Sequence, residues 1–527
     1  NFKNRLKNAS IFRLFYEMNS YVHFIMKKRE NKIRKRNNRR QWKEGKKMQQ
    51  EKKTAIDAIE QKASLVCEVA DHIWDYAELS LQEVRSAALY CEVLEKEGFH
   101  VEKGICGIET AFSASYGSGR PLIGILAEYD ALSGLSQEAG SLVRKERISG
   151  GSGHGCGHNL LGAGAFAAAL GIKAFLERSS CPGTVILYGC PGEEGGAAKA
   201  FMARDGVWRD LDAALTWHPE DVNEVETGSS NSCIQVQYKF TGMASHASGA
   251  PEKGRSALDA VELMNIGVQF LREHMSDRAR IHYAITDAGG CSPNVVQPRA
   301  SVLYMVRSNH VSEAVELQAR VDRIAEGAAL MTDTTFERKF IDGLADTVTN
   351  HTLERVLYDN FSALGVPQYT KEELEYADAL AKTYPGSEGL PGVAAENDEK
   401  LREEVAVLRK EYGHAMNAFL APFYQGEAFK AGSTDVGDVS WLTPTAQIHV
   451  AAWPNGCPGH SWQNVSCDCT EIGHKAAVHA GKVLAASAVE LFLHPEILEE
   501  ARKEFEKRTA EGYTCPIPAD AVPVIPD

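Results

Sequence analysis

The chain has 527 residues, of which 44% are hydrophobic and 24% are charged. This length exceeds one ordinary hydrophobic core, so we expect two domains, or one domain that carries a large insertion. No window approaches the roughly 20 apolar residues that a membrane-spanning helix needs, so we expect no membrane partner. The 12 cysteines follow no regular spacing, which indicates a reducing compartment and predicts a cytoplasmic protein. Cys467 and Cys469 form a Cys-x-Cys pair without a second pair nearby, so we interpret them as buried or incidental rather than as a zinc site.

Charge is unevenly distributed along the chain. Residues 1–47 contain 16 Lys and Arg against 3 Asp and Glu, a net charge of +13, so the remainder of the −14 chain carries −27. An acidic body argues against nucleic-acid binding. The basic segment has two interpretations. One is an arm that binds nucleic acid or membrane, although the segment lacks the apolar core and cleavage site of a secretory signal.

The second interpretation of the basic segment is a translated leader. The chain begins with Asn1 rather than Met, and codons for Lys43-Glu44-Gly45 can contain a bacterial ribosome-binding sequence shortly before Met48. We therefore expect that the native protein starts at Met48, and that residues 1–47 are a basic leader that is non-native or disordered.

Helices and strands alternate in the first part of the chain. From about residue 54, apolar residues recur with helical spacing. Apolar runs at 121–127, 184–188 and 212–217 predict buried strands, with helices between them that end at about residues 177 and 204. This order predicts an α/β fold, a mostly parallel sheet with helices on both faces.

The middle of the chain shows a different pattern. Residues 229–345 contain strands at about 233–240, 280–285 and 300–307 and helices at about 255–273 and 311–331. We expect an inserted α+β domain that acts as a lid and dimerisation domain. The catalytic domain then comprises residues 48–228 and 346–527, with a surface loop at about 384–400, a last buried strand at 446–452 and a proline-rich tail along the surface.

Ligand-type side chains follow the predicted strands. Asp130, Glu193, Glu194 and His218 each come at the carboxyl end of an apolar strand, where parallel sheets collect their ligands. The thiol and imidazole of Cys156-Gly157-His158 are good ligands for zinc-like metals. Of two adjacent carboxylates, one can bind metal while the other takes a proton from a metal-bound water.

These residues, together with His460, provide enough ligands for two metal ions and an activated water. His154 remains ambiguous between a ligand and a turn residue. A rival interpretation is a cysteine hydrolase in which Cys156 is the nucleophile and His158 the base. We disfavour it, because residues i and i+2 of a turn rarely point at each other.

The motifs resemble the dinuclear metallohydrolase family of aminoacylases, glutamate carboxypeptidases and indole-acetyl-amino-acid hydrolases, in its Cys-Gly-His branch. The resemblance runs from about residue 54 to the Cys-Pro-Ile-Pro tail. It is carried by strings that include Glu128-Tyr-Asp-Ala-Leu132, His154-Gly-Cys-Gly-His-Asn159, Tyr188-Gly-Cys-Pro-Gly-Glu-Glu-Gly-Gly196, Ala213-Ala-Leu-Thr-Trp-His-Pro219, Gly254-Arg-Ser-Ala-Leu258, Ser292-Pro-Asn-Val-Val-Gln297 and Ser433-Thr-Asp-Val-Gly-Asp438.

The resemblance implies a role for each site residue. It implies that Glu193 is the general base and that His246 is a lid histidine that stabilises the oxyanion in a neighbouring subunit. It also implies that Asn294 and Arg307 hold the substrate carboxylate. The implied metal ligands, for two divalent ions such as Zn²⁺ or Mn²⁺, are Cys156, His158, Glu194, His218 and His460. The family's usual His-x-Asp is Glu128-Tyr129-Asp130 here, so we expect Asp130 to support a ligand rather than bind metal itself.

The implied activity is hydrolysis of the amide bond of N-acyl or N-aroyl amino acids, with p-aminobenzoyl-glutamate as the expected substrate. The implied assembly is a homodimer or a heterodimer with a related A subunit. Two alternatives stay open: a broader aminoacylase or dipeptidase, and a non-catalytic partner subunit of a hetero-oligomeric hydrolase. The intact ligand set argues against the second alternative.

Overall fold

A seven-stranded sheet forms the centre of the computed structural model, which describes residues 49–392, 398–427 and 429–524. The strand order is β1-β2-β4-β3-β5-β13-β6. The four central strands β4, β3, β5 and β13 run parallel to one another. The strands are β1 (His100–Lys103), β2 (Phe112–Ser118), β3 (Leu122–Ala127), β4 (Gly183–Gly189), β5 (Ala213–Glu220), β6 (Glu224–Val225) and β13 (Thr445–Ala451). The predicted basic leader lies outside the described residues.

Helices cover both faces of this sheet, which confirms the predicted fold class. Inward side chains of alternate strand residues, such as Ile125 and Leu187, pack with one set of helices, whereas Leu126 and Tyr188 pack with another. The first set is α2 (Ala63–Tyr76), α3 (Val84–Lys96), α4 (His158–Arg178), α8 (His351–Leu364), α14 (Glu471–Leu493) and α15 (Pro495–Arg508). The second set is α5 (Ala198–Arg204) and α12 (Val436–Ser440).

Helices α4 and α14 pack against each other in the core. The expectation that no segment is long and apolar enough to cross a membrane was wrong for both helices by length and composition, but 83% of the apolar window of each is buried inside the protein. Small residues allow the close approach: a Cβ at Gly481 would lie 2.6 Å from Ala167 Cβ. Mostly buried apolar helices of this kind are common in the cores of soluble proteins.

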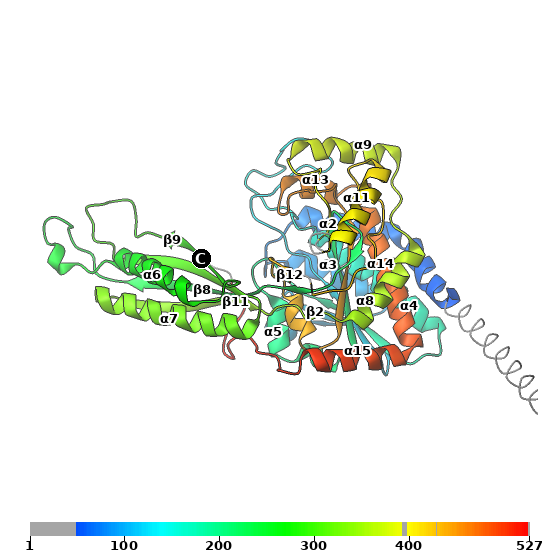
Figure 1. The fold of residues 1–527 in the computed structure, drawn as a ribbon, viewed down its shortest axis with the longest axis horizontal. Coiled ribbons are helices and arrows are strands. Elements are labelled where there is room, and N and C mark those ends of the chain that lie inside the picture. Colours follow the sequence, from blue (N-terminus) through cyan, green and yellow to red (C-terminus); the bar gives the residue numbers. More distant parts are fainter. Residues whose placement is uncertain (1–48, 393–397, 428, 525–527) are drawn as a thin grey trace, which may run out of the picture. The chain divides into compact units, whose positions relative to one another are not determined.

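Residues 232–344 form a second sheet with its own hydrophobic core. Its antiparallel order is β11-β8-β10-β9, from β8 (Ser232–Thr241), β9 (Arg280–Asp287), β10 (Arg299–Ser308) and β11 (Thr335–Leu344). Helices α6 (Ala257–Leu271) and α7 (Val311–Thr332) lie side by side along it (Figure 1). β9 is an edge strand that exposes Tyr283 and Ile285. The limits of a separate lid domain remain a prediction.

Shorter elements follow the second sheet along the chain. They are α9 (Lys371–Leu380), α11 (Glu399–Tyr412), α13 (Trp462–Asp468) and β12 (Phe429–Lys430), which pairs with β7 (Ser229–Ser230) from just before that sheet. The tail beyond α15 was predicted to run along the surface. Ile517 is nevertheless buried, because it packs into the core beside α5.

Candidate metal centre

A tight turn before α4 presents two of the predicted metal ligands. Gly157 has φ 68°, a left-handed conformation, and a Cβ there would lie 2.8 Å from Pro219 Cγ and 3.0 Å from the Trp453 ring. Only glycine combines this conformation with so close an approach. The turn thereby brings Cys156 next to His158, the first residue of α4.

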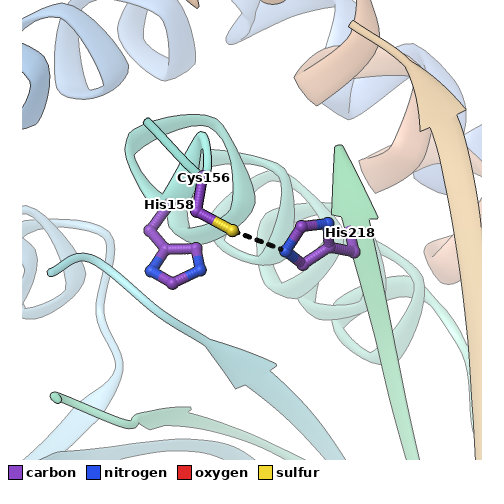
Figure 2. Close-up of side chains that lie close together, drawn as sticks. All are labelled: Cys156, His158 and His218. Carbon is purple, nitrogen blue, oxygen red and sulfur yellow. Dashed lines mark hydrogen bonds between the residues drawn. The ribbon is translucent and has the colours of Figure 1, made fainter. Parts of the chain in front are cut away.

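Cys156, His158 and His218 form the first group of ligand atoms, all within 4.8 Å of one another. Figure 2 shows Cys156 Sγ directed at His218 Nε2, 3.5 Å away. Both rings are held through Nδ1, which lies 2.8 Å from Asp130 Oδ1 for His158 and 2.7 Å from the Pro219 carbonyl for His218. Nε2 of each ring is thus left for a metal ion. The buried His158 Nε2 has no hydrogen-bond partner among the described residues.

Cys156, Glu194 and His460 form a second group, whose ligand atoms also lie within 4.8 Å of one another. His460 Nε2 lies 3.2 Å from Glu194 Oε1, and this carboxylate oxygen also lacks a hydrogen-bond partner in the part of the chain that the structure describes. Asp130 orients the group, because its Oδ2 accepts the backbone N–H of Glu194 at 3.0 Å.

The donor set fits two divalent ions, and each of the two groups would provide ligands for one of them. All five predicted ligands fall into the two groups, and Cys156 belongs to both. Thiolate, imidazole and carboxylate together are the ligands of zinc-like metals. His158 Nε2 and Glu194 Oε1 are buried and make no hydrogen bond among the described residues, although each has a side chain of possible opposite charge within 3.3 Å, and a metal ion would satisfy both atoms.

The geometry bears on the rival cysteine hydrolase. Two histidines lie near the Cys156 thiol: His158, which the rival interpretation makes the base, and His218 of β5, which is 3.5 Å away. Burial and the Glu194 carboxylate raise the pKa of the Cys156 thiol well above its usual range. A thiol nucleophile needs a lowered pKa, so this environment favours a cation at Cys156 over nucleophilic catalysis.

Glu193 lies in a third group of close ligand atoms, with Glu128 and His158. Burial, followed by the negative charges of Glu128 and Glu194, raises the pKa of Glu193 well above its usual value. A carboxyl group with a raised pKa can both accept and return a proton near neutral pH, as a general base requires.

Asp130 contacts two of the predicted metal ligands. Its carboxylate receives Ser80 Oγ at 2.8 Å in addition to His158 and Glu194. Although burial alone would raise the pKa of Asp130, the neighbouring His158 imidazole lowers it, so the carboxylate stays ionised. Within the described part of the chain, Asp130 belongs to none of the three groups of ligand atoms.

His154, which the sequence left ambiguous, and the Cys467–Cys469 pair, which was not predicted to be a zinc site, fall outside the ligand groups. His154 is buried, and its Nε2 lies 3.0 Å from the Ile73 carbonyl. Cys467 is also buried, while Cys469 donates to Asp71. Among the described residues, none of these three side chains belongs to a group of metal-ligating atoms.

The predicted lid residues lie at opposite ends of the second sheet. His246 and Asn294 are neighbours, because His246 bridges to Val295 and the backbone N–H of Ala247 donates to the Asn294 carbonyl at 3.0 Å. Arg307 lies at the other end of β10, roughly 25 Å along the strand at 3.3 Å per residue. One chain therefore does not bring Arg307 and Asn294 to the same carboxylate.

The surroundings of the lid residues differ as well. His246 has an Nδ1 that accepts the backbone N–H of Gly249 at 3.0 Å, so a neutral ring carries its proton on Nε2 as a donor. Arg307 is half-buried, and its Nη1 donates to Ser433 Oγ at 2.7 Å. Arg307 thus contacts a segment of its own chain that lies outside the second sheet.

Several buried charges near the site were not predicted to have a role. Lys199 ion-pairs with Glu128 and Asp435, and His449 lies between Glu224 and Glu226. Despite burial and the nearby Lys430, the hydrogen bonds with the two glutamates raise the pKa of His449 to about 9. One feature of the sequence could have identified Glu128 as a site residue: like Asp130, it follows the carboxyl end of β3.

The chain matches known proteins along most of its length. The profile of the peptidase family M20/M25/M40 matches residues 124–453. The B subunit of p-aminobenzoyl-glutamate hydrolase from Escherichia coli (strain K12) is 44% identical over 476 residues, which cover 89% of this chain and 97% of that protein.

The chain belongs to peptidase family M20/M25/M40. The family resemblance expected from the motifs is confirmed, and the chain is a hydrolase of this family. The Xaa-Arg dipeptidase of Mus musculus is 26% identical over 475 residues, 87% of this chain and 93% of that protein.

Two solved structures share the fold. An aminobenzoyl-glutamate utilization protein from Klebsiella pneumoniae has a TM-score of 0.55 at 15% identity, with 82% of this chain and 97% of that chain covered. A dinuclear metal binding peptidase of Bacillus subtilis has a TM-score of 0.50 at 18% identity, with 82% and 99% covered. At this identity the likeness establishes the architecture alone.

Proposed function

We propose that this chain hydrolyses the amide bond of p-aminobenzoyl-glutamate, releasing p-aminobenzoate and glutamate. One observation carries the proposal: the 44% identity to one chain of a p-aminobenzoyl-glutamate hydrolase extends over 97% of that protein. The convergence of the five ligand-type side chains supports it. The proposed cofactor is two divalent ions, Zn²⁺ or Mn²⁺, since thiolate and imidazole suit the first and carboxylate the second.

The bound ions would polarise the amide carbonyl and lower the pKa of a water molecule. Every other step falls to side chains of the protein. Glu193 takes the proton of the attacking water and returns it to the leaving nitrogen, for which its raised pKa suits it. Arg307 holds a substrate carboxylate near Ser433.

The oxyanion donor is His246 of a neighbouring subunit in this proposal. The proton on its Nε2 suits a donor that enters another site. The assembly is a homodimer or a heterodimer with a related A subunit, and the location is cytoplasmic. The chain divides into catalytic residues 48–228 and 346–527 and lid residues 229–345.

The experiment is a substrate panel. The purified chain, stripped of metal and reconstituted, is assayed alone against p-aminobenzoyl-glutamate, other N-acyl and N-aroyl amino acids, and dipeptides. Preference for the aroyl-glutamate supports the proposal, and activity that emerges only after an A subunit is added supports the heterodimer. The second candidate function is that of a dipeptidase, which the 26% identity to the Xaa-Arg dipeptidase supports. Preference for dipeptides that contain Arg would favour this candidate instead.

A further inference from the structure

Lys199 is a fully buried lysine between two carboxylates. Its Nζ lies 2.7 Å from Glu128 Oε1 and contacts Asp435 Oδ1, and its exposed fraction is 0%. Its backbone N–H also donates to Asp435 Oδ2 at 3.0 Å. Lys199 lies in α5, directly after the loop that carries Glu193 and Glu194.

The Glu128 arm of this cluster reaches the metal centre. Glu128 follows β3 and is only 3% exposed. While Oε1 faces Lys199, Oε2 lies 3.3 Å from Nε2 of the predicted ligand His158. The lysine charge therefore holds a carboxylate in place beside an atom that is left for metal.

The Asp435 arm reaches the predicted carboxylate-binding residue. Asp435 is fully buried just before α12, and Ser433 stands two residues earlier in the same loop. Ser433 Oγ accepts a hydrogen bond from Arg307 Nη1 at 2.7 Å. Polar contacts thus connect His158 with Asp435 through Glu128 and Lys199, and the backbone of residues 433–435 continues the connection to Arg307.

Stability alone is a poor explanation for such a cluster. Replacing a buried ion pair or triad by well-packed apolar residues is often neutral or stabilising, because desolvation offsets the attraction. A buried lysine between two carboxylates also fixes the relative positions of α5, the end of β3 and the start of α12. Apolar contacts fix positions less strictly, because they have little directional preference.

We propose that Lys199 is a positioning residue that holds Glu128 against the metal centre and holds the 433–435 loop against Arg307. This inference rests on the proposed function, since the role of Arg307 comes from there. The two arms can be separated by isosteric changes that keep the shape of each side chain.

The test compares Glu128→Gln, Asp435→Asn and Lys199→Met, with Lys475→Met as a control that removes an ion pair outside the site, between Lys475 and Glu373. Calorimetry measures metal binding to the stripped proteins, and kinetics measures KM and kcat for an aroyl-glutamate. Glu128→Gln is expected to weaken metal binding about 10-fold, as loss of a residue that orients metal ligands does. Its KM should stay within about twofold.

Asp435→Asn is expected to show the opposite split. KM should rise about 10-fold while metal binding stays within about twofold, because only the Arg307 arm is disturbed. Lys199→Met should show both effects and the control neither. If Lys199→Met fails to fold, the two isosteric variants decide alone.

Loss of thermal stability in all three site variants, with KM and metal affinity unchanged, would overturn the inference. The same pattern in both isosteric variants would overturn it as well, because the arms would not be separate. Arg307→Ala separates failure of the proposed function from failure of this inference. If Arg307→Ala leaves KM unchanged, the proposed role of Arg307 is wrong, but the effect of Glu128→Gln on metal binding still tests the role of Lys199.

Discussion

Glu193 and Glu194 are neighbours in sequence with different surroundings. Glu194 lies among ligand atoms with Cys156 and His460, while Glu193 lies beside Glu128. We expect Glu193→Gln to keep its metal and lose about 10²–10⁴-fold in kcat, the usual contribution of a general base. Glu194→Gln should lose metal instead. Elemental analysis and kinetics of both variants check this, and the reverse pattern would mean that the two roles are exchanged.

His449 makes the stability of the metal-free protein depend on pH. The pKa of His449 is raised from 6.5 to about 9 in the folded protein, so its stabilising contribution is fully present below pH 6.5 and lost as the pH rises through 9. The free energy of unfolding should fall by on the order of 3 kcal/mol over this interval. Denaturant unfolding in the presence of a chelator measures it. His449→Gln should flatten the profile, and an unchanged slope in this variant would contradict the assignment.

Single residues were predictable where a local signal existed. Cys156, Glu193 and His218 stand at turns or strand ends that the sequence displays, and the structure brings them together. The partners of Lys199 were not predictable. Asp435 is 236 positions away from it, and a single sequence carries no signal for such a contact. Asn294 and Arg307 were predicted to share a role, but a single chain places them at opposite ends of β10.

The turn before α4 is the element on which the site depends most. Gly157→Ala would place a Cβ 2.8 Å from Pro219 Cγ at φ 68°. We expect it to cost about 1–3 kcal/mol of stability and to weaken metal binding, because Cys156 and His158 would shift. Thermal unfolding and metal titration measure both effects.

A matched glycine provides the control for this prediction. Gly327 lies in α7, where a Cβ would meet nothing within 4 Å. Gly327→Ala should therefore gain about 0.5–1 kcal/mol from helix propensity and leave the metal site unaffected. Equal effects at the two glycines would show that the turn has no special requirement.

Among elements, the buried strands were predicted most accurately. β3, β4 and β5 are continuous apolar runs, and their observed limits agree with the prediction to within a few residues. β11 was missed, because its first half carries Glu337, Arg338 and Lys339 on a half-exposed strand. The edge strand β1 and its neighbour β2 were also missed: β1 is mostly exposed, and only the first part of β2 alternates between buried and partly exposed residues.

At the scale of the whole molecule, the proposed mechanism requires a site completed by a second subunit. His246 lies at the far end of the second sheet from Arg307, and among the described residues it belongs to none of the ligand groups of its own chain. We expect that mixing inactive His246→Ala and inactive Glu193→Gln chains restores part of the activity, because mixed dimers regain one complete site. The mixture is assayed after subunit exchange has been verified with labelled chains. No recovery would show that His246 acts within its own chain or not at all.

The fold class was predictable from the sequence, since alternating strands and helices leave few topologies. The assembly stays a prediction from the family resemblance, because a contact between subunits leaves no periodic signal in one chain. The sequence predicted β9 as a strand, but its position at the edge of the second sheet could not be predicted from the sequence pattern alone.

The central feature of the proposed mechanism is a dinuclear metal centre that shares Cys156. The most direct measurement is a titration of the metal-free chain with Zn²⁺ or Mn²⁺, with hydrolysis of p-aminobenzoyl-glutamate followed at each addition. We predict that activity is absent at first and reaches its plateau at about two equivalents per chain. In Cys156→Ser, binding of both ions should weaken together, because one thiolate belongs to both ligand groups. Full hydrolysis by the metal-free chain would contradict this mechanism.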